Sequence, residues 1–244
     1  MDYKLKIDLH IHSREDVAEQ VFGHDDLLPA TEIIDLAIAA NYDAISFTHH
    51  GLLYNDHYVS DYAKERGLLL ISGLEAIIER KHVLLINFTK HKHILNFTEL
   101  AKNISEDVAV IAPHPFYGGS SSLHGTLIEH IDLFDAIEYC HYYYRFLNPN
   151  RKAIKVAQQH HLPLVGNSDM HNRFQFGSAF SLVDTKEKSI PAIIDAIKNG
   201  RVTAVSNVMT LRRFVTETLW IANRTQKELR FKLVWHLNRF LERS

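Results

Sequence analysis

Short apolar runs alternate with segments of helical periodicity along most of this chain. Such runs are typical of buried strands, and a helical segment between successive runs predicts a parallel sheet covered by helices. We predict strands at residues 5–9, 44–47, 68–71, 83–87, 109–112, 136–139, 164–165 and 180–183. We predict helices at residues 31–40, 58–66, 97–103, 123–131, 151–160 and 190–198. Seven or eight strand–helix units favour a closed α/β barrel over an open sheet.

The length and composition agree with a barrel and exclude several other classes of protein. The chain has 244 residues, of which 46% are hydrophobic and 23% charged, as in soluble globular proteins. The single cysteine, Cys140, excludes an internal disulfide framework and a thiolate metal cluster. No uncharged run reaches the ~18 residues that span a bilayer, and no apolar export region follows Met1. We therefore predict a cytoplasmic location.

Histidines and acids gather where the predicted strands end. The clusters are Asp8-Leu9-His10-Ile11-His12, Thr48-His49-His50, Gly73-Leu74-Glu75, Pro113-His114-Pro115 and Asp169-Met170-His171, whereas His82 opens the fourth strand. The carboxyl ends of the strands of a β/α barrel face one mouth, where catalytic groups collect. We therefore expect these residues, although distant in sequence, to converge in space.

The spacing within these clusters favours metal binding. Alternate residues of a strand point to the same side, so His10 and His12 can reach one ion together, and Asp169 and His171 repeat the arrangement. The two oxygens of Glu75 can bridge two ions. A single His-x-His pair could equally be a hydrogen-bonded surface pair, but repetition at successive strand ends favours a metal site. Imidazole and carboxylate ligands without thiolates suit zinc, manganese or iron.

In this order the motifs resemble those of the polymerase-and-histidinol-phosphatase (PHP) family, from about residue 5 to about residue 206. The resemblance implies a distorted (β/α)7 barrel with phosphoesterase activity and a site for two or three divalent ions. It implies that the first ion is bound by His10, His12, Glu75 and Asp169. The second would share Glu75 and add His82 and His114. The third would be bound by Asp16, His50 and His171.

Two positions depart from the family pattern. Where the family usually has Thr-Asp-His, this chain has Thr48-His49-His50, so His49 replaces an acid. A Ser-Asp-Gly pattern is replaced by the segment 13–17, in which Asp16 is our choice of ligand and Glu15 the alternative. His141 also follows a predicted strand, and we interpret it as a supporting residue rather than a ligand.

These observations predict hydrolysis of a phosphomonoester or a nucleotide-like phosphoester by a metal-activated water. We assign Glu75, Asp169 and His50 to catalysis. Arg80, Arg145 and Arg173 are candidates for binding the substrate phosphate. The alternatives are a metal-dependent hydrolase of amides or esters and a metal-binding module without activity, because a fold does not determine a reaction.

The last segment, 211–244, lies beyond the resemblance and differs in charge from the barrel segment, 1–210. It carries eight Lys or Arg and three acids, so it is +5 in a chain of net charge −2, which leaves −7 for the barrel segment. Leu229, Leu233, Leu237, Phe240 and Leu241 fall on one face of a helix, Lys232, His236, Arg239 and Arg243 on another, with Phe231 and Trp235 beside the basic face.

We therefore predict a basic amphipathic helical tail. It could pack on the barrel, form a homo-oligomer or lie on an anionic membrane surface. In each case we expect the metal site to lie apart from this tail.

Overall fold

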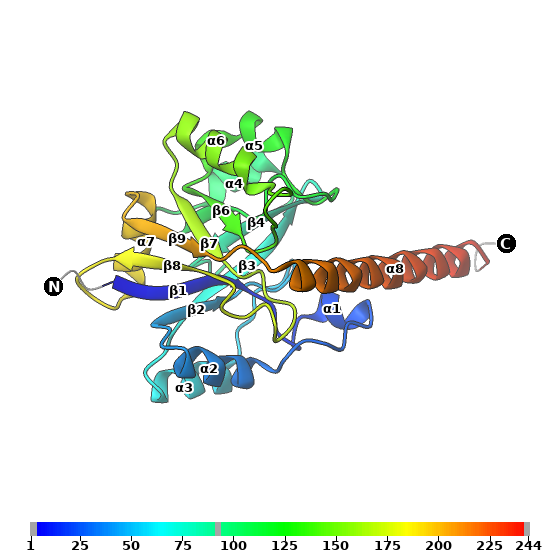
Figure 1. The fold of residues 1–244 in the computed structure, drawn as a ribbon, viewed down its shortest axis with the longest axis horizontal. Coiled ribbons are helices and arrows are strands. Elements are labelled where there is room, and N and C mark those ends of the chain that lie inside the picture. The colour runs from blue at the N-terminus through cyan, green and yellow to red at the C-terminus, as the bar shows by residue number, and fades with distance from the viewer. Residues whose placement is uncertain (1–3, 91–93, 242–244) are drawn as a thin grey trace.

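The computed structural model describes residues 4–90 and 94–241, with side chains described as far as Leu233. Within these ranges nine strands form a single curved sheet in the order β7-β6-β5-β4-β3-β2-β1-β8-β9 (Figure 1). The strands are β1 (Lys4–Ile11), β2 (Ala44–Phe47), β3 (Leu69–Ile78), β4 (Lys81–Ile86), β5 (Ala109–Ala112), β6 (Ala136–Cys140), β7 (Leu164–Asn167), β8 (Ala179–Asp184) and β9 (Val202–Ser206).

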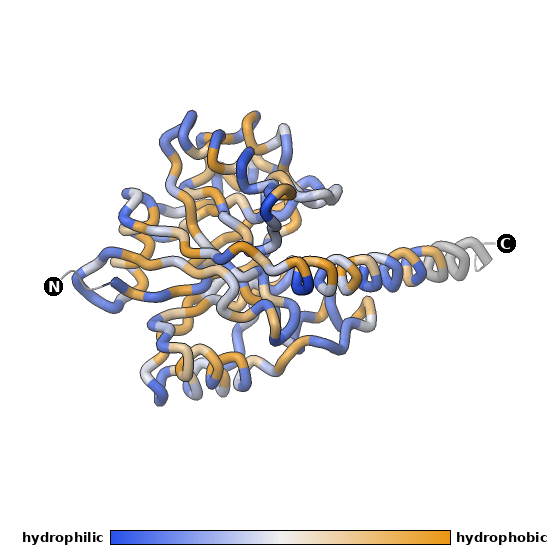
Figure 2. The backbone as a smooth tube through the Cα atoms, viewed as in Figure 1, coloured by the Kyte–Doolittle hydropathy of each residue, from blue (hydrophilic) through white to orange (hydrophobic). Residues whose placement is uncertain are grey.

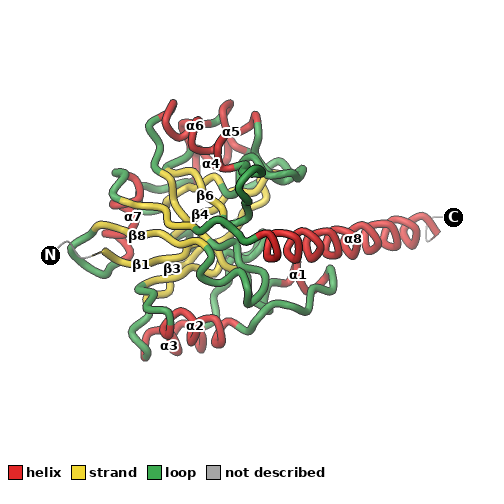
Figure 3. The backbone as a smooth tube through the Cα atoms, viewed as in Figure 1, coloured by secondary structure: helices red, strands yellow, loops and turns green. Residues whose placement is uncertain are grey.

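The helices lie around the outside of this sheet (Figure 3). They are α1 (Val17–Val21), α2 (Ala30–Ala39), α3 (His57–Glu65), α4 (Phe97–Asn103), α5 (Gly125–Glu129), α6 (Asn150–His160), α7 (Ile190–Lys198) and α8 (Leu211–Leu241), with a single 3-10 turn at Ile131–Leu133. The side chains of Asp56, Asn96 and Ser189 cap α3, α4 and α7 by accepting a hydrogen bond from the first turn.

The two ends of the sheet approach each other, which makes it a nearly closed barrel. Gly166 of β7 lies against β8, where its N–H donates to Ser181 Oγ at 2.9 Å. The Ser181 hydroxyl in turn donates to the Gly166 carbonyl at 3.0 Å. The prediction of a distorted β/α barrel with a C-terminal helix is therefore confirmed.

The prediction that the sheet is parallel is wrong at two strands. The strand β4 pairs antiparallel with β3 and β5, and β8 pairs antiparallel with β1 and β9. A two-residue turn joins β3 to β4, and both of its residues, Glu79 and Arg80, have left-handed φ values of 48° and 68°. Such a turn makes a hairpin, whose strands must be antiparallel. Apolar periodicity carries no information about strand direction.

Four other features were not predicted from the sequence. The strand β3 continues through Glu75 to Ile78, so this acid lies within a strand and not after one. The partly exposed edge strand β9 and the short helix α1 have patterns too weak or too short for periodicity to detect. The predicted helix 123–131 is divided into α5 and the 3-10 turn.

Apolar packing fixes the helices against the sheet. One buried cluster joins β1, β4 and β5 to α7 and includes Ile7, Leu84 and Ile193. A second joins α2 and α3 to β2, and a third joins α4, α5 and α6 to the β3–β4–β5 part of the sheet. Because side chains in such cores are closely packed, the ends of the strands are held in fixed relative positions.

The long helix α8 begins beside the loops that follow β1 and β7, and it extends away from the barrel (Figure 1). Hydrophilic and hydrophobic residues alternate along it (Figure 2), as predicted. Several of its apolar side chains are exposed, among them Leu219, Leu229 and Leu233, which are 61–66% accessible. The predicted apolar and basic faces also include residues whose side chains lie outside the described part of the chain, namely Trp235, His236, Leu237, Arg239, Phe240, Leu241 and Arg243. In the described part of the chain, every helix is too short or too polar to span a membrane.

A test of barrel closure is the replacement of Gly166 by alanine. A Cβ atom at this position would overlap the carbonyl oxygen of Phe180, so β7 and β8 would have to separate. We expect Gly166→Ala to lower the free energy of unfolding by about 1–3 kcal/mol, as overpacking does, in equilibrium urea unfolding. A Cβ on Gly125 would meet no atom within 4 Å, so Gly125→Ala is the control. Equal midpoints for the two variants would contradict this account of closure.

Candidate metal centre

The site is built around Glu75, whose side chain is 1% exposed in the middle of β3. Its Oε1 lies 2.6 Å from His82 Nδ1 and 3.1 Å from His114 Nε2. Its Oε2 lies 3.1 Å from His50 Nε2 and 3.5 Å from His12 Nε2. These histidines come from β1, β4 and the loops that follow β2 and β5, so the two oxygens of one carboxylate connect four separate parts of the barrel.

Asp169 supplies a second carboxylate on the other side of the β1 histidines. Its Oδ1 lies 3.2 Å from His10 Nε2 and 3.6 Å from His12 Nε2. Both Nε2 atoms are buried, and within the described residues neither forms a hydrogen bond. Buried nitrogen atoms that face carboxylates without hydrogen-bond geometry are suited to a metal ion.

Four groups of potential ligands meet in this way. In each group the ligand atoms lie within 4.8 Å of one another, and adjacent groups share residues. The groups are His10–His12–Asp169, His10–Glu75–His114, His50–Glu75–His82 and His12–His50–His171. These clusters of His, Glu and Asp fit a site for several metal ions, and they contain eight of the nine ligands predicted from the sequence.

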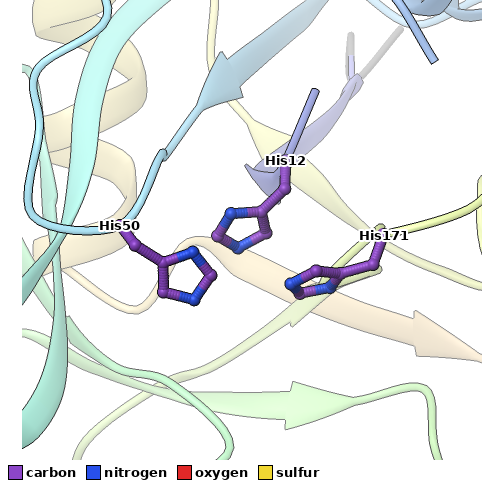
Figure 4. Close-up of side chains that lie close together, drawn as sticks. All are labelled: His12, His50 and His171. Atoms are coloured by element: carbon purple, nitrogen blue, oxygen red, sulfur yellow. The ribbon is translucent and has the colours of Figure 1, made fainter. Parts of the chain in front are cut away.

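The group of three histidines shows how distant segments converge. His12 follows β1, His50 follows β2 and His171 follows β7, and their rings point toward a common space (Figure 4). The ring centroid of His12 lies 4.4 Å from that of His50 and 4.2 Å from that of His171. Both neighbouring rings are stacked against the His12 ring, at interplanar angles of 27° and 21°.

Asp16, the ninth predicted ligand, lies behind these histidines. It caps α1, since its Oδ1 accepts a hydrogen bond from the Ala18 N–H at 3.0 Å. Its Oδ2 lies 2.9 Å from Nδ1 of both His12 and His50. Asp16 therefore orients two histidines, and it is absent from the four groups.

Glu19, one turn further along α1, is a second acid beside the histidines of the predicted third ion. Its side chain is 5% exposed, and its Oε1 lies 3.6 Å from both His50 Nδ1 and His171 Nε2. Sequence reasoning missed Glu19 because the ligand position was sought in the segment 13–17, before the start of α1.

Glu138 was also missed, although it supports two ligands. This buried residue of β6 forms a 2.8 Å hydrogen bond with His10 Nδ1 through Oε2. Its Oε2 also accepts from Asn167 Nδ2 at 3.1 Å, and its Oε1 accepts from the His114 backbone N–H at 3.1 Å. Such carboxylate–histidine contacts fix the ring so that the other nitrogen faces the metal. The available signal was a single acid within the apolar run 136–140.

Two of the ligand residues have an unusual backbone. His114 and Asp169 have φ values of 28° and 47°, in the left-handed region that residues other than glycine rarely adopt. His114 is also flanked by Pro113 and Pro115, which restrict the backbone further. Strained backbone of this kind is concentrated at functional sites, where the surrounding structure fixes the side chain in a productive position.

The crowding of charged groups shifts their pKa values. Burial alone would raise the pKa of Glu75, but the neighbouring His82, His50 and His10 hold it well below its usual range. Burial, together with His171 and His50, lowers the pKa of His12 to about 3. The His12 imidazole is therefore neutral at physiological pH, and a neutral imidazole nitrogen is the form that binds a metal ion.

His49 and His141 lie outside the four groups. Nε2 of His49 lies 2.8 Å from Ser13 Oγ, and burial lowers the pKa of His49 to about 4. At the position where the family usually has an acid, this chain therefore has His49 as a neutral, buried side chain. His141 Nε2 lies 3.1 Å from Glu217 Oε2 of α8, so it is oriented by the tail and not by a ligand group.

The ligand groups open into a cavity of about 540 Å³. Its walls include the loop 118–122, which Lys81 holds in place through the Ser120 and Ser122 carbonyls. Arg80, Arg145 and Arg173, the predicted phosphate-binding residues, are all exposed and are absent from this lining. Arg173 pairs instead with Glu32 at 2.6 Å.

The residues of the four groups all lie outside the tail, as expected, but the tail is not remote from the cavity into which they open. Trp220, Arg224 and Lys232 of α8 line the same cavity as His50 and His171. The Trp220 ring centroid lies 6.5 Å from that of His171.

Comparisons with other proteins agree with this architecture. A family model described as PHP-associated matches residues 148–202. A crystal structure of a two-domain protein from Bacteroides vulgatus, described as containing a predicted PHP-like metal-dependent phosphoesterase, is 23% identical with a TM-score of 0.63. The match covers 84% of this chain and 65% of that one. A search of curated proteins found no match.

Two further solved structures are similar. PsfC from Pseudomonas syringae is 13% identical with a TM-score of 0.56, over 91% of this chain and 98% of that one. The lesion-specific endonuclease PfuEndoQ from Pyrococcus furiosus is 16% identical with a TM-score of 0.55, over 88% and 66%. This chain therefore spans less than two thirds of the Bacteroides and Pyrococcus proteins. Together with the matched model, these likenesses confirm the PHP-like fold.

The ligand groups predict that protein purified without chelator holds two or more equivalents of transition metal. His10 and Asp169 take part in the groups at the bottom of the site, so His10→Ala combined with Asp169→Ala should remove most of that metal. His57→Ala changes an exposed histidine at the start of α3 and serves as the control. Elemental analysis checks the prediction, and less than one equivalent after growth with added zinc, manganese and iron would contradict it.

Proposed function

We propose that this chain, which has the PHP-like fold, is a metal-dependent hydrolase of phosphoesters. The observation that supports the proposal most strongly is the buried Glu75, whose two oxygens are surrounded by five histidines. An isolated pair of polar residues has many structural explanations, but a buried carboxylate within a ring of imidazoles is suited to bridging two cations.

In this proposal the residues of the site have separate roles in binding the metal ions and in orienting the ligands. Glu75 and Asp169 supply negative charge that retains cations, and His10, His12, His50, His82, His114 and His171 supply nitrogen ligands. Bound divalent ions of this kind lower the pKa of water and withdraw charge from phosphoryl oxygens. Glu138 and Asp16 hold the histidine rings in the required orientation. The imidazole-rich set favours zinc, manganese or iron.

A phosphomonoester or a nucleotide-like phosphoester is the proposed substrate class. The cavity of about 540 Å³ falls within the range of small-molecule sites, and Tyr117, Tyr142 and Trp220 give it aromatic walls suited to a nucleobase. Two of the similar structures have names that describe phosphoester cleavage, a PHP-like phosphoesterase and an endonuclease. A cytoplasmic location and a homo-oligomer formed through the exposed apolar side chains of α8 remain predictions.

Replacement of Glu75 by glutamine tests the proposal. The variant keeps the size of the side chain but removes the charge between two proposed cations, so we expect hydrolysis to fall by at least ~100-fold. The matched control is Glu79→Gln. Glu79 lies four residues after Glu75, at an exposed position of the turn between β3 and β4. Steady-state rates with p-nitrophenyl phosphate and a set of nucleotides check the prediction.

The substrate panel also separates the alternatives. Equal, mild effects of the two substitutions would contradict the role of Glu75. Turnover of p-nitrophenyl acetate or of amides, without turnover of phosphoesters, would show a hydrolase of another class. Metal-loaded protein that is inactive on every substrate would favour a binding module.

A further inference from the structure

The helix α8 presents charged residues to the cavity beside Trp220 and Ile221, while several of its apolar residues are exposed. Trp220, Arg224, Glu228 and Lys232 recur at helical spacing and all line the cavity. A helix that only covers a barrel would bury an apolar face, whereas Leu219 of α8 is 66% exposed. Apolar contacts of α8, such as Phe214 with Tyr142 and Phe231 with Phe22, therefore do not account for the charged residues that face the cavity.

Arg224 is the cation of this face that lies deepest. Its side chain is 12% exposed, and Nη2 pairs with Glu19 Oε2. The other oxygen of Glu19 lies 3.6 Å from His50 and from His171, so only one carboxylate separates the guanidinium from the histidine group. The guanidinium also lies 4.7 Å from the centroid of the Trp220 ring, and the Trp220 indole is fixed by a 2.8 Å hydrogen bond to Asp26.

One edge of this guanidinium has unused hydrogen-bonding capacity. Nη1 of Arg224 is buried and has no hydrogen-bond partner among the described residues. A buried donor without a partner is costly, which points to a group that completes the site. Guanidinium donors match the oxygens of phosphate in geometry and charge.

From these contacts we propose that Arg224 of α8 binds the non-bridging oxygens of the substrate phosphoryl group. The tail is then a wall of the substrate site rather than an appendage. This inference rests on the proposed function, because it assigns a residue of the same site to the phosphoryl group.

Lys227 provides a matched control on the same helix. Its Nζ donates to the Gly23 carbonyl at 3.0 Å and so also anchors α8 to the segment after α1, but Lys227 does not line the cavity. If Arg224 served only to dock the helix, removal of the Arg224 or the Lys227 side chain would change phosphate binding equally.

The experiment measures binding of inorganic phosphate to the full-length, metal-loaded protein by calorimetry, with metal content determined on the same samples. We expect Arg224→Gln to weaken phosphate binding by about 10-fold or more, since a charge-assisted hydrogen bond is lost. Arg224→Lys should recover part of the loss, because it restores the charge but not the planar fork. Lys227→Ala should resemble the unaltered protein, and metal content should be equal in all four.

Three results would overturn the inference. Unchanged phosphate affinity in Arg224→Gln would show that the guanidinium does not contact phosphate. Equal weakening in Lys227→Ala would reduce Arg224 to an anchor of the helix. Weakening accompanied by loss of metal would mean that Arg224 acts only through Glu19. Phosphate binding that depends on Arg224 without turnover of any phosphoester would overturn the proposed function and leave this inference standing.

Discussion

Burial of the Glu75 carboxylate is the constraint on which the rest of the site depends. A carboxylate removed from water costs several kcal/mol unless it is paired. Here five imidazoles surround it, and they come from β1, β4 and the loops after β2 and β5. The closed barrel brings these segments together, and the hairpin of β3 and β4 places His82 beside the carboxylate. The fold thus concentrates carboxylate charge and imidazole nitrogen atoms in one buried volume, as metal binding requires.

The ligands could be predicted from the sequence because their signals are local. A His-x-His pair at the end of an apolar run determines which side both rings face, and the mouth of a barrel collects such pairs. The supporting residues could not be predicted in the same way. Glu138 appears in sequence as one acid within an apolar strand. Four strands separate β6 from β1 in the sheet order, and only the closure of the barrel brings Glu138 to His10. The position of Asp16 could not be predicted either, because Asp16 caps α1, and this helix is too short to show periodicity in the sequence.

The contribution of the tail to the cavity was not predicted from the sequence, and the cause is physical. An amphipathic pattern predicts that a helix buries its apolar side, and it does not show which residues of the barrel the polar side will meet. In the structure the ion pair Arg224–Glu19 and the contact between Glu217 and His141 orient α8, with Leu229 and Leu233 exposed. Electrostatic attraction between a basic tail and an acidic barrel therefore competes with apolar burial. The opposite net charges of 211–244 and 1–210 were the signal in the sequence.

The central claim is that Glu75 bridges metal ions at the mouth of the barrel. Anomalous diffraction from crystals of the full-length protein grown with Mn²⁺, measured at the manganese absorption edge, tests it most directly. The account predicts at least two anomalous peaks, both within coordination distance of the Glu75 carboxylate and each beside histidines of the four groups. Peaks confined to other parts of the surface, or one ion bound without Glu75, would contradict it.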